Sequence, residues 1–338
     1  MQIEQLIVVE PGRIELQRAE LDSQLQPHQA LVETEYSIVS AGTEGAGFTG
    51  LVKQMPFAEA GQYPRTTGYG NLGRVLEVGA AVEMCQIGDR VLSFSSHASR
   101  VKADAGRMAL PVPKEADGER LVFARMAGVS ISALRSSSVQ AGDTVLVLGA
   151  GLVGNFAAQL FQLAGADVMV ADLADLRLQK ARACGLSRTV NSATDDLEAA
   201  VMDWTGGRGV HVAVEAIGLS PVIAQAVALT RRYGEVILLG SPRAPAVFDA
   251  TPMLLRIHLE AIRMIGSLEW RWPQHETERG RDLTANYRQL VEWIDQERLQ
   301  VAPLLDQVAA PADCQAVYEG LTARQGETMS AVFGWSRR

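Results

Sequence analysis

Residues 144–154 read TVLVLGAGLVG and contain the strongest structural signal in the chain. The first five residues form an apolar, β-branched run that predicts a buried strand. Gly149, Gly151 and Gly154 follow in G-x-G-x-x-G spacing, and an apolar helical pattern begins directly afterwards. In this setting the first glycine permits a tight turn, the second lets the backbone approach a pyrophosphate, and the third allows close helix–strand packing. Because a helix N-terminus offers free N–H groups to phosphates, the stretch predicts a dinucleotide site.

A second strand-like run ends at Asp172, which follows Gly151 by 21 residues. At this distance an acidic side chain binds the hydroxyl groups of the adenosine ribose. Its charge repels the 2′-phosphate of NADP, so the sequence favours NAD(H) and disfavours NADP(H) as the cofactor. A helix N-cap is the structural alternative for Asp172, and the two roles are compatible. We expect Arg177 to lie over the adenine, to hold Asp172, or to accept a phosphate.

Four further residues are predicted to contact the cofactor. Leu152 and Val153 lie between the second and third glycines, at the start of the helix. Ala216 and Gly240 follow two later strands, at the sheet edge where the nicotinamide half of a dinucleotide is expected.

The pattern of the chain changes near residue 121. Before it, short strand-like runs are separated by turns, and the predicted strands cover 6–9, 30–36, 73–78 and 90–94. After it, strands and helices alternate. The predicted strands are 144–148, 167–171, 189–190, 210–215, 235–239 and 263–266, and the predicted helices are 122–138, 155–164, 176–184, 196–204 and 221–229, with one further amphipathic helix at 283–296. Such alternation indicates a parallel, doubly wound α/β sheet. We therefore predict a domain at 121–272, and a second domain formed by 1–120 and 273–338.

Composition limits the partners of this chain of 338 residues. A hydrophobic content of 47% with 21% charged residues is typical of a globular α/β protein. The net charge of −8 argues against nucleic acid or an anionic membrane as a partner, so a small-molecule substrate is expected. No run approaches the roughly 20 apolar residues of a membrane helix, and we see no signal peptide. Three distant cysteines argue against disulfides and for a cytoplasmic location.

Three further motifs carry a family resemblance: Gly-Thr-Glu at 42–44, Gly-Tyr-Gly-Asn-Leu-Gly-Arg-Val at 68–75 and Gly-Asp-Arg-Val at 88–91. Together with the domain order, they resemble the medium-chain dehydrogenase/reductase superfamily, in particular its alcohol, polyol and threonine dehydrogenases. The resemblance implies a GroES-like β-barrel catalytic domain beside the Rossmann domain. It also implies a homodimer joined through the Rossmann sheet edges.

The chain departs from this family at the positions of the zinc ligands. Where zinc members read Cys-Gly-Thr-Asp and Gly-His-Glu, this chain has Ala41 and Tyr69-Gly70. Near the third ligand position it has Arg125, Met126 or Ala127, depending on register. Catalytic zinc needs three ligands drawn from thiolate, imidazole or carboxylate groups. The four cysteines of a structural zinc lobe are also missing from residues 92–107. We therefore expect a protein without zinc.

Without zinc, hydrogen-bond donors must polarise the substrate oxygen. Thr43 matches the family hydroxyl that passes a proton between substrate and cofactor ribose, although a buried turn threonine is the structural alternative. Tyr69 replaces a ligand histidine; its phenol can donate a proton, or its ring can simply fill the space left by the metal. Glu44 is expected to orient Thr43, to act as a base, or to form a structural ion pair. His97 is expected on the surface or in a loop.

These residues support three functional hypotheses. The first is a zinc-independent, NAD(H)-dependent oxidoreductase that moves a hydride between nicotinamide and a carbonyl or secondary alcohol. The second is an NAD(P)H-dependent quinone or enoyl (C=C) reductase, against which Asp172 counts. The third is a non-catalytic NAD(H)-binding protein, which the loss of every zinc ligand suggests.

Overall fold

The chain divides into two compact units in the computed structural model, which describes residues 1–51, 62–272, 282–323 and 328–336. Unit 1 comprises Met1–Met126 and Trp272–Arg338, and unit 2 comprises Ala127–Arg271. The sequence places the corresponding borders at residues 120 and 273. No helix in these described ranges has the length and apolar character needed to cross a membrane.

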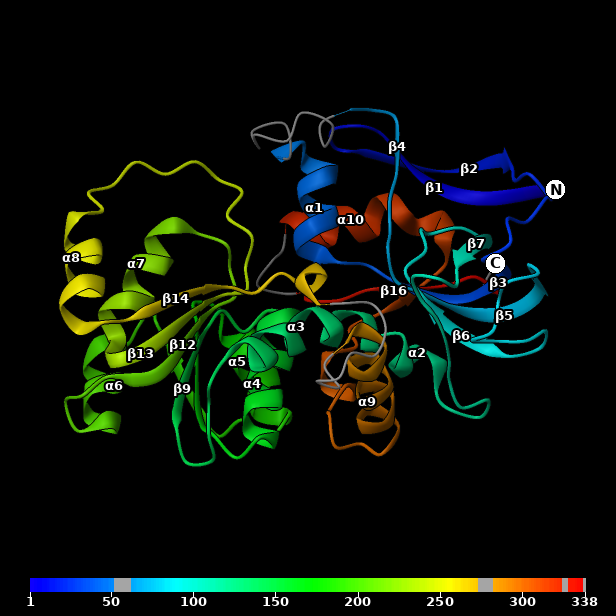
Figure 1. Cartoon of the computed structure of the whole chain (residues 1–338). Helices are drawn as coiled ribbons and strands as arrows, with labels where there is room; N and C mark the ends of the chain where they lie inside the picture. Colours follow the sequence, from blue (N-terminus) through cyan, green and yellow to red (C-terminus); the bar gives the residue numbers. More distant parts are fainter. Residues whose placement is uncertain (52–61, 273–281, 324–327, 337–338) are drawn as a thin grey trace. The chain divides into compact units, whose positions relative to one another are not determined.

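Unit 2 is built on a six-stranded parallel sheet (Figure 1). Its strands are β9 (Thr144–Leu148), β10 (Asp167–Asp172), β11 (Arg188–Asn191), β12 (Val210–Glu215), β13 (Thr230–Leu238) and β14 (Arg263–Gly266). They are arranged in the order β11-β10-β9-β12-β13-β14, which is the Rossmann order. The direction of strand addition reverses between β9 and β12. In sheets of this type, ligands bind outside the carboxyl ends of the strands at the reversal.

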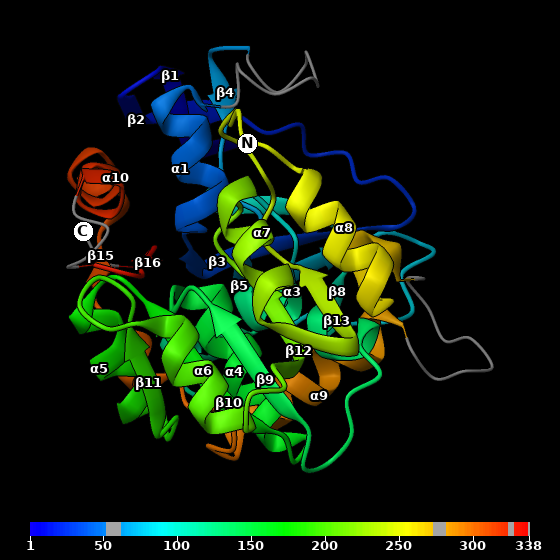
Figure 2. The ribbon, with the colours of Figure 1, turned by 90° about the vertical axis from the view of Figure 1, so that its left-hand side faces the viewer.

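Helices cover both faces of this sheet (Figure 2). They are α3 (Ala124–Ser136, which begins in unit 1), α4 (Leu152–Leu163), α5 (Asp175–Ala183), α6 (Leu197–Thr205), α7 (Ser220–Leu229) and α8 (Thr251–Glu260). Phe161 of α4 belongs to the same core cluster as Val145, whereas Val201 of α6 and Val227 of α7 cluster with Leu146. Neighbouring strand residues point to opposite faces, so a strand covered on both faces has to be apolar throughout. This explains the unbroken apolar run at β9.

Unit 1 is a mainly antiparallel β domain. Its strands are β1 (Gln2–Glu10), β2 (Arg13–Glu20), β3 (Gln29–Ile38), β4 (Arg65–Thr66), β5 (Asn71–Val78), β6 (Arg90–Ser93), β7 (Arg100–Asp104), β8 (Ala109–Pro111), β15 (Val308–Ala309) and β16 (Val332–Gly334). One sheet has the order β2-β1-β4, and the other β15-β16-β3-β5-β6-β8 with β7 paired to β3. The predicted fold class, a Rossmann domain with a GroES-like β domain, is confirmed.

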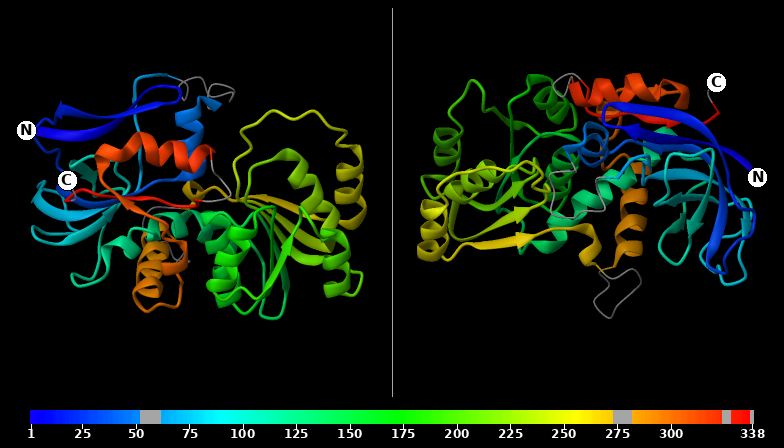
Figure 3. Two further views of the ribbon diagram at one scale, coloured as in Figure 1. Left: turned by 180° about the vertical axis from the view of Figure 1, so that it is seen from behind. Right: turned by 90° about the horizontal axis from the view of Figure 1, so that it is seen from above.

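The last part of the chain completes unit 1. The helices of this unit are α1 (Ala41–Thr49), α2 (Gly118–Leu121), α9 (Leu283–Asp295) and α10 (Cys314–Ala323). Helix α10 lies along the β1–β2 hairpin (Figure 3), where Val317 and Tyr318 join Leu6 and Val8 in one core cluster. Strand β16 then pairs antiparallel with β3. The tail therefore contributes both a core face and a sheet strand.

The predicted elements of unit 2 match the structure to within a few residues, except that β13 begins at Thr230, five residues before the predicted strand. Strands β2, β4, β7, β8, β15 and β16 and helices α1, α2, α8 and α10 were not predicted from the sequence. Helix α1 has the composition AGTEGAGFT, and its glycines and threonines are weak helix formers. Its helical state depends on the packing of its buried side, which sequence patterns do not reveal.

Candidate functional site

The glycine-rich turn after β9 has the geometry of a phosphate-binding loop. Gly149 adopts a φ of 101°, which L side chains rarely tolerate. A Cβ on Gly154 would lie 1.8 Å from the Gly149 carbonyl oxygen, so only glycine permits this contact between helix and strand. Gly151, the N-cap of α4, has nothing within 4 Å of its Cβ position. The backbone is thus open at the one glycine that the motif assigns to ligand approach.

Asp172 at the end of β10 organises this turn. Its Oδ2 accepts the Ala150 N–H at 2.7 Å, and its Oδ1 accepts the Ala174 N–H at 2.9 Å. Arg177 Nη1 lies 3.4 Å from Asp172 Oδ2, so the arginine holds the carboxylate, which is one of the three roles considered for it. The carboxylate therefore joins the glycine turn to the start of α5.

Glu215, at the end of β12, holds the turn that follows this strand. This role was not predicted from the sequence. Glu215 Oε1 accepts N–H groups from Ile217, Gly218 and Leu219. Burial raises the pKa of Glu215 above its usual value, although these three donors oppose the shift. The signal for this role in the sequence is a charged residue at the end of an apolar strand. The carboxyl group fixes the turn that begins with Ala216.

The two residues predicted at the nicotinamide side lie around this turn. The Ala216 N–H donates to the Leu148 carbonyl at 2.9 Å, and the Gly240 N–H donates to the Glu215 carbonyl at 2.8 Å. A Cβ on Gly240 would lie 2.3 Å from the Gly218 nitrogen. Leu152 is buried and Val153 half-buried in the first turn of α4.

In unit 1, helix α1 carries two of the predicted catalytic residues on different sides. Thr43 is exposed, whereas the Glu44 side chain is buried. Glu44 Oε1 accepts the N–H of Ser40, the N-cap residue, at 2.8 Å. The structure therefore places Glu44 in the interior of unit 1, and Thr43 at its surface.

Glu44 belongs to a buried polar network. Its Oε2 accepts hydrogen bonds from the hydroxyl groups of Thr67 (2.8 Å) and Tyr318, and lies 3.0 Å from Nε2 of His97. His97 Nδ1 lies 2.7 Å from the Ser37 hydroxyl. Of the roles considered for Glu44, this geometry fits the structural one, because the buried carboxylate is hydrogen-bonded inside unit 1 and lies against His97. His97 lies in the loop between β6 and β7, which is one of its two expected positions, but the surface position is wrong because His97 is 0% exposed.

The network shifts the pKa values of Glu44 and Tyr318 in opposite directions. Burial alone would raise the pKa of Glu44, but the charge and hydrogen bond of His97, with the donors Tyr318 and Ser40, bring it below the ordinary value of 4.5. Burial and the neighbouring Glu44 carboxylate raise the pKa of Tyr318 well above 10. Glu44 therefore stays ionised and Tyr318 stays a proton donor at neutral pH.

Tyr69 lies in a second cluster, beside the first. Its hydroxyl group is hydrogen-bonded to Ser40 Oγ, and its ring lies over the guanidinium group of Arg125, with 4.5 Å between Cζ and the ring centroid. Arg125 Nε also donates to the Tyr69 carbonyl oxygen at 2.9 Å. Tyr69 itself is half-buried. The Tyr69 side chain is thus held at its hydroxyl group by Ser40 and over its ring face by Arg125.

The residues at these positions do not fit a zinc ion. Contacts join Ser40, which precedes Ala41, to Tyr69, and Tyr69 to Arg125. The three positions therefore surround one place, and they offer a methyl group, a phenol and a guanidinium. None of these belongs to the donor set of protein zinc sites. Across the described ranges, no cluster of three or more His, Cys, Asp or Glu residues is arranged to hold a metal.

The zinc-binding dehydrogenase family matches residues 153–323, half of the chain. The protein belongs to this family. More widely, it is a member of the medium-chain dehydrogenase/reductase superfamily, as the sequence motifs predict.

Individual relatives agree with this assignment. The chain is 32% identical over 202 residues to (R,R)-butanediol dehydrogenase of Bacillus subtilis, a match that covers 52% of this chain and 58% of that relative. An Escherichia coli oxidoreductase/dehydrogenase of unknown specificity superposes with a TM-score of 0.83, at 19% identity and 99% coverage of both chains. A Sinorhizobium meliloti dehydrogenase structure bound to NADP has a TM-score of 0.81 at 19% identity, covering 98% of this chain and 99% of that one. These two structures establish the fold alone.

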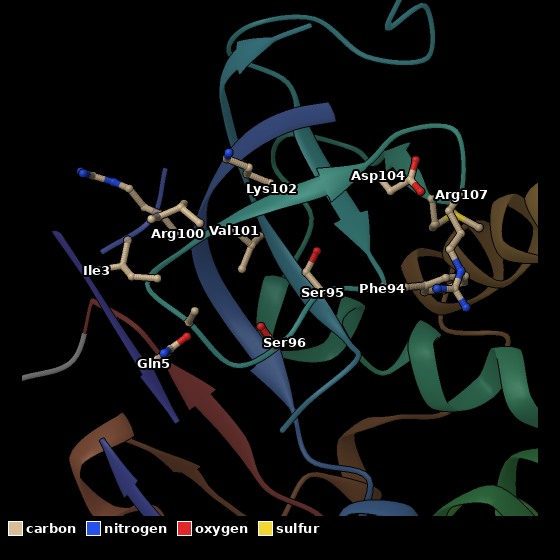
Figure 4. Close-up of a pocket in the computed structure, with 13 residues that line it drawn as sticks. Ile3, Gln5, Phe94, Ser95, Ser96, Arg100, Val101, Lys102, Asp104 and Arg107 are labelled. Atoms are coloured by element: carbon tan, nitrogen blue, oxygen red, sulfur yellow. The ribbon is translucent and has the colours of Figure 1, made fainter. Parts of the chain in front are cut away.

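Unit 1 of this family member also carries an open groove of about 320 Å³ (Figure 4). Its cations do not converge, because Arg100 and Lys102 lie at one end and Arg107 at the other, beside Phe94. Arg100 pairs with Glu33 and Lys102 with Asp22. The groove therefore does not have the concentrated positive charge of an anion site.

The glycine geometry predicts different outcomes for two alanine substitutions. Gly151→Ala should retain the melting temperature, since its Cβ meets open space, but weaken NADH binding by roughly tenfold or more by keeping the pyrophosphate from the backbone. Gly154→Ala should lower both the melting temperature and the affinity for NADH, because its Cβ collides with the Gly149 carbonyl oxygen. Nicotinamide fluorescence and thermal unfolding measure the two effects. NADH binding by Gly151→Ala at wild-type affinity would contradict the assigned role.

The Glu44 network predicts a pH dependence of stability. Because the folded-state pKa of Glu44 is depressed, its contribution is complete above about 4.5 and is lost as the pH falls through the folded-state value. Glu44→Gln should reduce stability at neutral pH by about 1–3 kcal/mol, since His97 loses a charged partner. Below pH 4.5, the substitution should also make the unfolding free energy depend less steeply on pH. The change in slope corresponds to at most about one proton taken up on unfolding. Urea unfolding between acid and neutral pH tests this, and an unchanged slope would exclude titration of Glu44 on unfolding.

Proposed function

We propose that this protein is a zinc-independent, NAD(H)-dependent oxidoreductase that moves a hydride between nicotinamide and a carbonyl or secondary alcohol. The observation that carries the proposal is the position of Tyr69, a half-buried phenol in the place of a ligand histidine. Matched relatives are named as butanediol, sorbitol and threonine dehydrogenases, which supports an alcohol or polyol substrate.

The preference for NAD(H) rests on Asp172. Its carboxylate is fixed at the end of β10 by the N–H groups of Ala150 and Ala174. A negative charge held at this place accepts ribose hydroxyl groups and repels a 2′-phosphate. Arg177 neutralises part of that charge but does not remove the acceptor oxygens.

The proposed chemistry divides between the cofactor and unit 1. When bound, reduced nicotinamide supplies the hydride. Tyr69 donates its hydroxyl proton to the carbonyl oxygen in the direction of reduction and takes it back in the direction of oxidation. Thr43, exposed on α1, completes the proton path to the cofactor ribose. Glu44 and His97 hold α1 in place from inside the domain.

A specific observation also favours a second function, from a different functional class. The replacement of all three zinc ligands also suits an NAD(H)-binding protein without catalytic activity. A binder of this kind needs the glycine turn and Asp172 but has no requirement for the Tyr69 hydroxyl. Reduction of an activated C=C bond is less well supported, because Asp172 disfavours NADPH.

We also propose a homodimer through the edge of the Rossmann sheet. Edge strand β14 exposes Met264, and the neighbouring helix α8 exposes Leu254, Leu255 and Leu259. Such apolar side chains beside β14, the last strand of this sheet in the described part of the chain, favour association with a second copy. Sedimentation that finds only single chains at micromolar concentration would exclude this arrangement.

Cofactor preference can be measured directly. Wild-type protein should bind NADH at least roughly tenfold more tightly than NADPH, since hydrogen bonds to a charged group contribute about 1.5–3 kcal/mol. Asp172→Asn should narrow this ratio, because it keeps the shape but removes the repulsion of a 2′-phosphate. Nicotinamide fluorescence titrations give both affinities. Tighter NADPH binding by the wild type would favour the C=C reductase hypothesis instead.

The Tyr69 hydroxyl provides the test of the reaction itself. Tyr69→Phe should lower kcat for carbonyl reduction by roughly 100-fold or more, the usual loss for a general acid, while NADH affinity is retained. Steady-state kinetics over a panel of ketones and secondary alcohols measures the effect. NADH binding without turnover of any panel member would support the non-catalytic alternative, and full activity in Tyr69→Phe would remove Tyr69 from the mechanism.

A further inference from the structure

Arg125 is a buried cation enclosed by aromatic rings. Its side chain is 1% exposed, and its guanidinium Cζ lies 4.5 Å from the ring centroid of Tyr69 and 4.6 Å from that of Phe94. Its Nη1 donates to the Tyr287 hydroxyl group at 2.6 Å. Arginine is the cation best suited to such a place, because its planar group stacks on rings and is weakly hydrated. The positive charge is thereby fixed in the interior, on one face of the Tyr69 ring.

The neighbouring glycine is shaped to this arginine. A Cβ on Gly70 would lie 2.6 Å from Arg125 Cγ and 2.9 Å from Ile38 Cγ2. A side chain at position 70, such as the glutamate of the Gly-His-Glu motif in zinc members, would displace the arginine. Gly70 therefore leaves the space that Arg125 occupies, and a side chain at position 70 is incompatible with the arginine in this position.

We propose that Arg125 acts through Tyr69 as a positioning residue that supplies, at this site, the positive charge which zinc supplies in other family members. This inference rests on the proposed function. Arg125 itself contacts no substrate, since it is buried. It holds the Tyr69 ring from one face and the Tyr69 carbonyl through Nε, while Ser40 holds the hydroxyl group.

The charge matters at one step of the reaction. In carbonyl reduction, the hydride of reduced nicotinamide forms the new C–H bond, and the C=O π pair takes the proton of the Tyr69 hydroxyl. Tyr69 is left as a phenolate, which the adjacent guanidinium stabilises electrostatically and the Ser40 hydroxyl stabilises by hydrogen bonding. After the alcohol leaves, one proton from solvent restores the Tyr69 hydroxyl group through the proposed path that includes Thr43. The nicotinamide is oxidised, the carbonyl is reduced, and no metal takes part.

Substitutions at Arg125 separate charge from volume. Arg125→Met keeps an unbranched side chain but removes the charge, and should lower kcat roughly 10- to 100-fold with little change in KM or NADH affinity. The isotope effect on kcat with 4-deuterated NADH should rise, because the chemical step becomes slower. Arg125→Lys restores a cation without the planar group and its two hydrogen bonds, and should recover part of the kcat that Arg125→Met loses. A purely structural role would reduce the active fraction without changing the isotope effect.

A second buried arginine of unit 1 provides the matched control. Arg90 is 7% exposed and bonds to Glu35 and the Ala116 carbonyl, so Arg90→Met also removes a buried guanidinium. It should lower the melting temperature while kcat per folded molecule stays at the wild-type value.

The outcomes distinguish this inference from the proposed function. Turnover that Tyr69→Phe abolishes but Arg125→Met leaves unchanged would overturn the role of Arg125 alone. Equal losses in Arg125→Met and Arg125→Lys would also overturn it, since charge would then be irrelevant. A wild-type protein that binds NADH but reduces no carbonyl would overturn both proposals together.

Discussion

A guanidinium group can be removed from water only where other groups replace its hydration, and this constraint shapes unit 1 around Arg125. Two aromatic faces, a tyrosine hydroxyl and a backbone carbonyl are among the groups that surround the charge. Position 70 must remain glycine to leave room for the side chain. The same enclosure orients Tyr69, whose hydroxyl reaches Ser40 at the start of α1. One buried cation thus determines the identity or orientation of several neighbours.

The buried network around Glu44 has a structural role that differs from that of Arg125. Glu44 and His97 lie inside unit 1, where Thr67, Tyr318 and Ser40 complete the hydrogen bonds of the carboxylate. A fully bonded buried network specifies one packing arrangement, because any partner lost leaves a costly unsatisfied group. Tyr318 comes from α10, so the network also ties the end of the chain to the helix that carries Thr43. We therefore see it as support for the site, and Tyr69 as the proposed participant in chemistry.

The sequence predicted the Rossmann domain well because local patterns and the global fold agree there. Strand β9, Gly149, Gly151 and Gly154 form one continuous motif, and each glycine has the steric environment that the motif implies. In unit 1, the proposed function depends on contacts between distant segments. Residues 40, 69, 125 and 287 meet only after folding, so the sequence could name Arg125 as one of three candidates for a lost ligand position but could not show its contact with Tyr69. The burial of His97 was missed for the same reason, because its partners Ser37 and Glu44 are 60 and 53 residues away.

The central claim is that a tyrosine backed by a buried arginine performs the task of zinc in this family member. Metal analysis combined with an assay of carbonyl reduction tests it most directly. We predict that protein dialysed against a strong chelator contains no stoichiometric zinc, reduces carbonyls at the same rate as untreated protein, and gains nothing from added zinc. About one tightly bound zinc per chain, with activity lost on chelation and restored by the metal, would contradict the account.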